Sequence, residues 1–290
     1  MNDNMIGLEG KVVTVTGAGN GLGREYALLC AREGAKVVVN DLGGSRDGTG
    51  AAHAAADAVV DEIKAAGGEA VANYDSVATE AGGEAIVATA LDTYGRIDGI
   101  VSNAGILRDV SFHKMTSDQW QAVIDVHLTG TYNVIRAAWP HMREQKFGRI
   151  VVATSTSGLF GNFGQANYGA AKMGMVGLIN TLAIEGARVN ITANAVSPLA
   201  ATRMTQELVT EEFAAKMPPG FVAPLVAHLL NEYTTDTATV IVAGAGRMYR
   251  TQLFENEGVT FDGIPSVDDV EAKWGEIVGM ENARVGVNPL

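Results

Sequence analysis

The sequence predicts an α/β protein with a parallel sheet of about seven strands and helices on both faces of the sheet. Three observations predict this class. Short runs rich in valine and isoleucine, typical of buried strands, recur along residues 11–243. These runs alternate with longer helical segments, and such alternation favours parallel pairing. Glycine, 35 of 290 residues, gathers where segments end, which indicates tight turns and close ligand approach.

The elements follow one another in a regular order. The first strand covers residues 11–16, and a glycine-rich turn leads into a helix that runs to about residue 34. Further strands are predicted at 35–40, 69–74, 98–101, 149–154, 190–196 and 238–243. Helices are predicted at 51–66, 79–94, 117–143 and 164–186, and a helical region broken by prolines at 207–230. Pro140 should kink or shorten the end of the long helix.

The last segment of the chain differs from the rest. From Gly244 the pattern lapses into loop, and Ser266 then begins a short amphipathic helix with Asp269 in a capping box. Residues 251–290 carry eight acidic and two basic side chains, so they hold half of the net charge of −12. We therefore expect a single catalytic domain over 1–246. The extension over 247–290 should dock on this domain or on a partner subunit.

Composition excludes several classes of protein. A net charge of −12 argues against an extended nucleic-acid surface. No uninterrupted apolar stretch is long enough to span a membrane, and the N-terminus lacks the features of a signal peptide. The last three residues, Asn-Pro-Leu, are not the peroxisomal address Ser-Lys-Leu. Cys30, the only cysteine, is expected to be a core residue. We expect a soluble cytoplasmic protein without a metal site.

The glycine-rich turn after the first strand has the features of a phosphate site. Its small residues permit a sharp turn, and the helix that follows directs backbone N–H groups at an anion such as a pyrophosphate. An ordinary strand-to-helix turn is the alternative. The residues concerned are Gly17, Asn20, Gly21, Leu22 and Gly23.

Carboxylates end the next two strands. Asp41 could accept both hydroxyls of an adenosine ribose and would repel a 2′-phosphate, which favours NAD, although Arg46 keeps NADP as an alternative. Asp75 and Ser76 could bond the adenine amino group, or could simply cap the next helix. The polar, glycine-rich loop 42–50 between these elements has no assigned task.

A further group of small residues follows the fourth strand. Asn103, Ala104 and Gly105 would let a ring or a ribose lie close to the backbone. They complete the candidate binding residues of the first half of the chain.

Ser155, Tyr168 and Lys172 suit proton transfer between an alcohol and a ketone. Tyr168 and Lys172 are one helical turn apart, so they share a face. A nearby cation favours the phenolate, and the Ser155 hydroxyl can hydrogen-bond the reacting oxygen. A solvated Tyr/Lys face is the alternative for the isolated pair.

Together these motifs resemble the short-chain dehydrogenase/reductase family, whose fold is a Rossmann-type doubly wound sheet, over residues 8–246. Within the family the chain is similar to the (3R)-hydroxyacyl-CoA dehydrogenase domain of multifunctional β-oxidation enzymes, which also act as hydroxysteroid dehydrogenases. The segments behind this closer likeness are 40–44, 71–77, 103–109, 161–168 and 203–205.

The resemblance implies a role for each residue. Tyr168 would be the general acid/base, Ser155 would orient the substrate oxygen, and Lys172 would bind the nicotinamide ribose and bias Tyr168 toward phenolate. His127 stands where the family usually has a relay asparagine; a buried structural histidine is the alternative. Pro198 and Thr202 would contact the nicotinamide. The family usually forms homodimers or homotetramers through the helices at 117–143 and 164–186.

The expected activity is NAD-dependent oxidation of a secondary alcohol, a (3R)-3-hydroxyacyl-CoA or a hydroxysteroid of the 17-beta type. Phe160 and Phe163 could line an apolar pocket or pack in the core. One alternative is a 3-oxoacyl thioester reductase that uses NADPH, and another is a non-catalytic dinucleotide-binding module. Positive charge for a CoA group could come from Arg108, Lys114, Arg203, Arg247 and Arg250.

Overall fold

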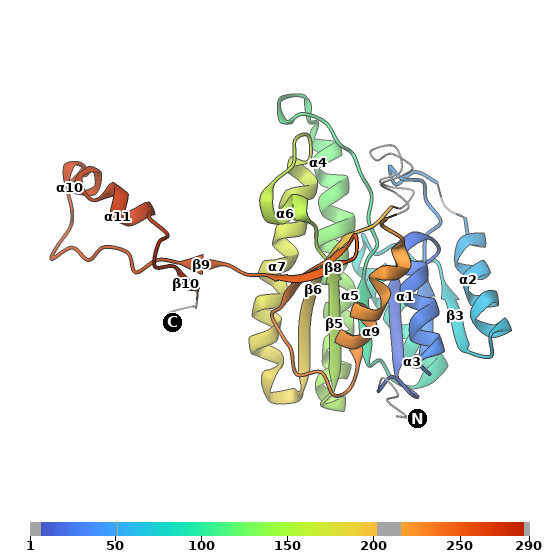
Figure 1. Cartoon of the computed structure of the whole chain (residues 1–290). Coiled ribbons are helices and arrows are strands. Elements are labelled where there is room, and N and C mark those ends of the chain that lie inside the picture. Colours follow the sequence, from blue (N-terminus) through green and yellow to red (C-terminus); the bar gives the residue numbers. More distant parts are fainter. Residues whose placement is uncertain (1–6, 51, 202–215, 287–290) are drawn as a thin grey trace. The chain divides into compact units, whose positions relative to one another are not determined.

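The predicted fold class is confirmed. The computed structural model describes residues 7–50, 52–201 and 216–286 (Figure 1). Its main sheet has eight strands in the order β3-β2-β1-β4-β5-β6-β7-β8, and all of the neighbours from β3 to β7 pair in parallel. The strands are β1 (Val12–Thr16), β2 (Lys36–Asn40), β3 (Glu69–Asn73), β4 (Gly99–Ser102), β5 (Gly148–Ala153), β6 (Ile191–Leu199), β7 (Val240–Gly244) and β8 (Arg247–Thr251).

Helices cover both faces of the sheet. Among the described residues up to Tyr249, the helices are α1 (Gly21–Arg32), α2 (Ala54–Ala65), α3 (Glu80–Tyr94), α4 (Ser117–Ile124), α5 (Gly130–Gln145), α6 (Thr156–Phe160), α7 (Ala166–Gly186) and α9 (Ala223–Leu230). Short 3₁₀ turns lie at η1 (Phe112–Lys114), η3 (Ala187–Val189) and η4 (Pro219–Phe221). Helices α1, α2 and α9 contribute to one apolar core, and α3, α5 and α7 to the other.

Alternation along the strands explains why there are two cores. In β1, Val13 and Val15 belong to the core under α1, whereas Val12 belongs to the core under α3 and α5. Successive strand residues point to opposite faces, so a continuous valine run is apolar on both sides. Cys30 lies in the first core, where burial raises the pKa of its thiol to about 12. Its prediction as a core residue is confirmed.

The prediction of one continuous helix at 117–143 is wrong in one detail. It consists of α4 and α5 joined by a π-helical turn, η2 (Asp125–Thr129), which holds His127. Pro140 does not shorten α5, which continues to Gln145. π-helical turns often occur at functional sites.

The chain divides into two compact units, Met1–Tyr249 and Arg250–Leu290. The expectation of loop from Gly244 onward is wrong, because β8 begins at Arg247 and the second unit pairs β9 (Phe254–Glu255) with β10 (Arg284–Val285) in antiparallel fashion. That unit also holds α10 (Val267–Ala272) and α11 (Trp274–Val278). The predicted capping box of Ser266 and Asp269 begins α10.

Among the described residues, no helix has an apolar run long enough to cross a bilayer.

Arg149 is a buried cation at the amino-terminal end of β5, opposite the binding pocket described below. Its guanidinium donates to the carbonyl oxygens of Gly148, Asn190, Asn231 and Glu232 at 2.9–3.0 Å. It also lies 4.3 Å from the centroid of the Phe147 ring. The side chain thereby joins β5 to the segments that precede β6 and follow α9, far from the site.

Replacing Arg149 should make the protein easier to unfold and should leave the structure of the site unchanged. Arg149→Met leaves several buried carbonyl oxygens without donors, so we expect the free energy of unfolding to fall by about 3 kcal/mol. Urea titration measures this loss. The matched substitution Arg188→Met removes an exposed arginine of η3 and should leave the unfolding curve in place; equal curves for the two variants would contradict the structural role.

Candidate active site

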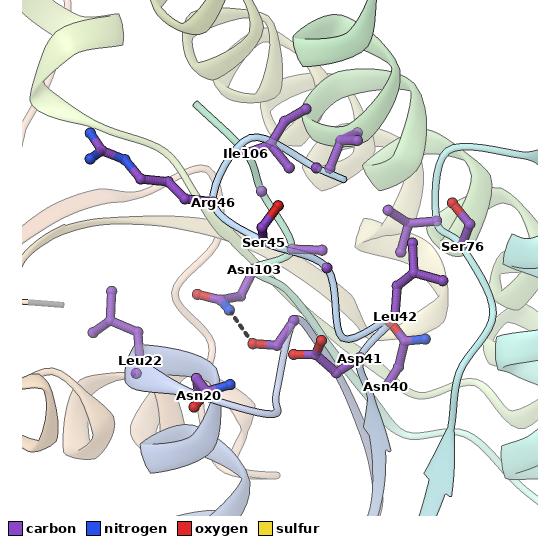
Figure 2. A pocket seen from close by; sticks show the side chains of 18 of the residues that line it. Asn20, Leu22, Asn40, Asp41, Leu42, Ser45, Arg46, Ser76, Asn103 and Ile106 are labelled. Carbon is purple, nitrogen blue, oxygen red and sulfur yellow. Dashed lines mark hydrogen bonds between the residues drawn. The ribbon is translucent and has the colours of Figure 1, made fainter. Parts of the chain in front are cut away.

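The candidate binding pocket lies at the carboxyl ends of the parallel strands. The sheet order changes direction between β1 and β4, and ligands of open α/β sheets bind at such a switch point. Figure 2 shows the pocket with side chains from β2, from the turn after β1 and from the segment after β4 around it. Of the predicted binding residues, ten line it: Gly17, Asn20, Gly21, Leu22, Asp41, Asp75, Ser76, Asn103, Ala104 and Gly105.

Thr16 and Asn103 hold the two sides of the switch point together. The Thr16 hydroxyl accepts hydrogen bonds from the backbone N–H groups of Asn103 and Ala104, each at 3.1 Å. In return, the Asn103 amide donates to the carbonyl oxygens of Thr16 at 3.2 Å and Gly17 at 3.1 Å. Figure 2 marks one hydrogen bond of the Asn103 side chain with a dashed line. This clamp of Thr16 and Asn103 fixes the glycine turn against the end of β4.

Close approach explains the glycines of the turn. A Cβ at Gly17 would lie 2.8 Å from the Cα of Ala104, and Gly17 has a φ of +65°. A Cβ at Gly23 would lie 2.2 Å from the carbonyl oxygen of Gly17. Both contacts are too short for any side chain, so the turn keeps an open cradle at the start of α1, where backbone N–H groups can receive an anion.

Asp41 is fixed by the same turn. Its Oδ2 accepts from the N–H of Gly19 and its Oδ1 from that of Gly43, each at 2.7 Å. Carboxylate oxygens can accept further hydrogen bonds, so Asp41 still offers acceptors to a ligand. An anion cradle beside a fixed carboxylate, with small residues between them, fits a dinucleotide that carries a pyrophosphate and a free ribose.

The loop over 42–50, which had no assigned task, forms a wall of the pocket. Leu42, Ser45 and Arg46 are among its lining residues. The carbonyl oxygen of Arg46 accepts from Leu107 N–H at 3.0 Å, which ties the loop to the segment after β4. Inside the loop, hydrogen bonds from Ser45 and Thr49 lower the pKa of Asp47 to about 2. Sequence reasoning missed this wall because its contacts are distant in the chain.

Ser155, Tyr168 and Lys172 are brought together as predicted. Ser155 follows β5 and caps α6, whereas Tyr168 and Lys172 lie one turn apart on α7. Burial raises the pKa of Tyr168, a hydrogen bond with Ser155 lowers it, and the charge of Asp109 raises it further. The net direction is upward, so the phenol keeps its proton at neutral pH.

Lys172 is buried and close to Tyr168. Its Nζ donates to the carbonyl oxygen of Ala153 and lies 5.4 Å from the centroid of the Tyr168 ring. Burial lowers the pKa of this lysine to about 7. Loss of solvent displaces the pKa of both Tyr168 and Lys172 toward the uncharged form. The bias of Tyr168 toward phenolate by Lys172 stays a prediction.

His127 reaches the same site from the π-helical turn. Its ring lies edge-on to Tyr168, with 5.1 Å between centroids. Nε2 lies 2.8 Å from the Ile106 carbonyl oxygen and 3.0 Å from its nitrogen, and the buried Nδ1 has no partner among the described residues. Burial and the charge of Lys172 lower the His127 pKa well below its ordinary value, so the ring is neutral. A Cβ at Gly105 would lie 2.2 Å from the ring, which explains that glycine.

The remaining predicted residues lie elsewhere. Pro198 is within β6 and is not among the described residues that line the pocket, and Thr202 lies outside the described residues, as does Arg203. Phe160 and Phe163 are 69% and 90% exposed, so the alternative of core packing is wrong for them.

Comparisons with known proteins agree with the geometry. The family model for short chain dehydrogenases matches residues 11–212. A short-chain type dehydrogenase/reductase of Mycobacterium tuberculosis is 62% identical over 97% of this chain and 98% of its own length. The peroxisomal multifunctional enzyme A of Dictyostelium discoideum is 51% identical over 94% of this chain, which spans 61% of that longer protein. These matches confirm the resemblance found in the sequence.

Other relatives differ in their named reaction. A 3-oxoacyl-[acyl-carrier-protein] reductase of Synechocystis is 42% identical over 83% of this chain and 95% of its own length. Among solved structures, a short chain dehydrogenase from Mycobacterium avium has a TM-score of 0.82 and 36% identity, covering 97% of this chain and 98% of that one. A 7α-hydroxysteroid dehydrogenase complexed with NADH has a TM-score of 0.76 and 26% identity, covering 85% and 97%.

The ligand-free protein should contain one lysine that titrates near neutrality. Because burial lowers the pKa of Lys172 from 10.5 to about 7, the unfolded chain holds a proton between these values that the folded chain lacks. This lysine's contribution to stability therefore increases with pH across that range. NMR of protein labelled with ¹³C at lysine Cε should show a resonance titrating near pH 7. It should vanish in Lys172→Met and persist in the exposed-site variant Lys64→Met; its absence from the parent protein would contradict the assignment.

Proposed function

The chain belongs to the short chain dehydrogenase/reductase family, and we propose that it interconverts a secondary alcohol and a ketone, with NAD as the hydride carrier. The observation that carries this proposal is the meeting of three groups at the end of β5. Ser155 lies close enough to Tyr168 to lower the pKa of its hydroxyl, and Lys172 Nζ lies 5.4 Å from the centroid of the Tyr168 ring. A non-catalytic binding module would have no use for this arrangement.

Each residue has one task in the proposed reaction. The Ser155 hydroxyl donates to the substrate oxygen and holds the carbon in place. In the oxidative direction Tyr168 removes the hydroxyl proton, and in the reductive direction it returns that proton to the oxygen. When bound, the nicotinamide supplies the acceptor or donor for the hydride. The raised pKa of Tyr168 makes the phenol the resting form, which is ready to act as an acid.

His127 and Lys172 complete the proposed proton path. The neutral imidazole holds the Ile106 backbone beside the pocket and presents an unpartnered Nδ1 within the site. Lys172, whose pKa is near neutrality, can hold or release a proton within the working pH range. We propose that Lys172 also contacts the nicotinamide ribose, and that Pro198 and Thr202 lie near the nicotinamide.

The proposed cofactor is NAD rather than NADP. Asp41 is held in the pocket by two backbone N–H groups, so it cannot turn away from a 2′-phosphate. Electrostatic repulsion between this carboxylate and the phosphate supports the preference. Arg46 also lines the pocket and is the feature in favour of NADP.

The proposed substrate has an apolar body, as in a (3R)-3-hydroxyacyl-CoA or a hydroxysteroid. Phe112, Phe160 and Phe163 are large and exposed. The segments that carry them lie side by side, because Val110 donates to the Gly164 carbonyl oxygen at 2.8 Å. The peroxisomal multifunctional relative and the 7α-hydroxysteroid dehydrogenase support these two substrate classes.

A second candidate is reduction of a 3-oxoacyl thioester with NADPH. The Synechocystis reductase supports it, as does the protonated resting state of Tyr168, which suits ketone reduction. Asp41 argues against NADPH, so the two candidates differ first in cofactor preference.

We also propose a homodimer or homotetramer that pairs through α4, α5 and α7. Trp120, Tyr132 and Ile184 leave apolar surface exposed on these helices, at 36%, 51% and 72%. Such surface is typical of subunit contacts. The buried free thiol of Cys30 fits a reducing compartment, so the cytoplasm is the proposed location.

Removing the Tyr168 hydroxyl should abolish the reaction and spare cofactor binding. Tyr168→Phe should lower kcat by about 100-fold or more, because the proton loses its acceptor, while the Kd for NADH stays the same. The kcat is measured from the production of NADH with hydroxyacyl-CoA esters and hydroxysteroids as substrates. The Kd for NADH is measured by fluorescence titration. Tyr233→Phe removes an exposed phenol from the segment after α9 and is the control. Full activity of Tyr168→Phe would overturn the proposed function.

Cofactor preference should depend on Asp41. The parent chain should bind NADH at least tenfold more tightly than NADPH, because the Asp41 carboxylate accepts hydrogen bonds from the ribose hydroxyls and repels a 2′-phosphate. Asp41→Ser should remove most of this preference, and Asp61→Ser, which changes an exposed aspartate of α2, should keep it. Tighter binding of NADPH by the parent chain would favour the reductase candidate.

A further inference from the structure

Two buried asparagines end neighbouring strands beside the pocket. Asn40 is the last residue of β2 and Asn73 the last residue of β3, and they are paired in register. They are only 2% and 5% exposed. Buried amides require hydrogen-bond partners, and most of the buried residues in the strands of this sheet are valine, isoleucine or alanine. The two amides therefore need an explanation that packing alone does not supply.

The two amides form a closed network around Asp75. Asn40 Nδ2 donates to Asn73 Oδ1 at 2.8 Å and to the Asp75 carbonyl oxygen at 2.9 Å. Asn73 Oδ1 also accepts from the Asp75 N–H at 3.0 Å. Asn73 Nδ2 donates to Asp75 Oδ2 at 2.8 Å and to Thr89 Oγ1 at 2.9 Å. Thr89 in turn donates to the Ala85 carbonyl oxygen at 2.9 Å within α3.

The side-chain amide of Asn73 is held in one orientation by this network. Both of its N–H bonds and both acceptor positions of its oxygen are in use. Rotating the amide by half a turn would set its NH₂ against the NH₂ of Asn40 and its oxygen against the Asp75 carboxylate. The network therefore fixes both the backbone and the Oδ2 atom of Asp75.

Asp75 is thereby set to accept a hydrogen bond inside the pocket. It is exposed and lines the pocket, and its Oδ1 has no hydrogen bond among the described residues. It does not cap the next helix: Thr79 does so for α3, accepting from Gly82 N–H at 3.1 Å. Ser76 Oγ accepts only from the nearby Ala78 N–H, at 3.3 Å. The capping alternative for Asp75 is wrong.

We propose that Asn40, Asn73 and Thr89 are positioning residues that make the pocket selective for a dinucleotide with an exocyclic amine on its purine. This inference rests on the proposed function. A fixed carboxylate accepts from the 6-amino group of adenine, and it repels the 6-oxo group of hypoxanthine or guanine. Selectivity of this kind requires that Asp75 cannot turn aside, and Asn73 prevents that rotation.

The test compares NAD with nicotinamide hypoxanthine dinucleotide, which differs in that 6-position and in the ring nitrogen beside it. Calorimetry on the full chain should give an at least tenfold lower Kd for NAD. Asp75→Ala should bring the two Kd values close together. Leucine is nearly isosteric with asparagine but makes no hydrogen bonds. Asn73→Leu should therefore lower the ratio of the hypoxanthine-dinucleotide Kd to the NAD Kd almost to the value found in Asp75→Ala. Thr89→Val releases one N–H of Asn73 and should reduce the ratio less.

A matched control separates positioning from a general loss of stability. Asn194 is a fully buried asparagine of β6, and it bonds Asp236 and Thr239 away from the pocket. Asn194→Leu should destabilise the chain and leave the ratio of the two Kd values unchanged. A wild-type ratio in Asn73→Leu overturns the inference even if both affinities fall. If Asn73→Leu does not fold, a wild-type ratio in Thr89→Val overturns it instead.

The same experiment distinguishes this inference from the proposed function. Equal binding of the two dinucleotides by the parent chain, or an unchanged ratio in Asp75→Ala, overturns the selectivity alone. Absence of any dinucleotide binding by the parent chain overturns the proposed function, and the inference falls with it.

Discussion

The clamp between Thr16 and Asn103 is the contact on which the rest of the site depends. It joins the ends of β1 and β4, the two strands between which the sheet order reverses. The segments after β1 and β4 lead toward α1 and α5, which belong to different cores, and the clamp holds the starts of these two segments together. The glycine turn then has only one path, because Gly17 must pass within contact distance of Ala104. The ends of β2 and β3 extend the same edge and complete the pocket.

Burial sets the electrostatics of the three side chains proposed to handle protons. Tyr168, Lys172 and His127 all have pKa values displaced toward the uncharged form, and loss of solvent is the largest cause each time. Because these side chains are buried, little solvent surrounds them. Charges that develop during a reaction would then interact strongly with their neighbours, since a dry environment screens them weakly.

Local patterns were enough to predict the sheet, because short runs of β-branched residues such as Val37-Val38-Val39, bounded by turn residues, favour buried strands. The glycine turn and the pair of Tyr168 and Lys172 were also predictable, since a turn and a helical face are short-range features. The wall formed by loop 42–50 and the bonds of Asn73 to Asn40 and Thr89 were not. These contacts join residues distant in the chain, and neither residue type nor spacing reveals which amide will meet which carboxylate. Burial of Lys172 was likewise invisible in the sequence, as was the rise in the Tyr168 pKa that burial causes.

The π-helical turn at Asp125–Thr129 limits how this chain can vary in length. It contains one residue more than an α-helical turn would need, and that excess places His127 at Tyr168. Deleting a single residue there would restore an ordinary α-helical turn, because the wide π-turn takes up its extra residue locally. The buried side of α5, including Val134 and Ala138, would still face the sheet, but His127 would lose the turn that sets its ring against Tyr168. A change of one residue in this stretch would therefore alter the site and leave the core in place.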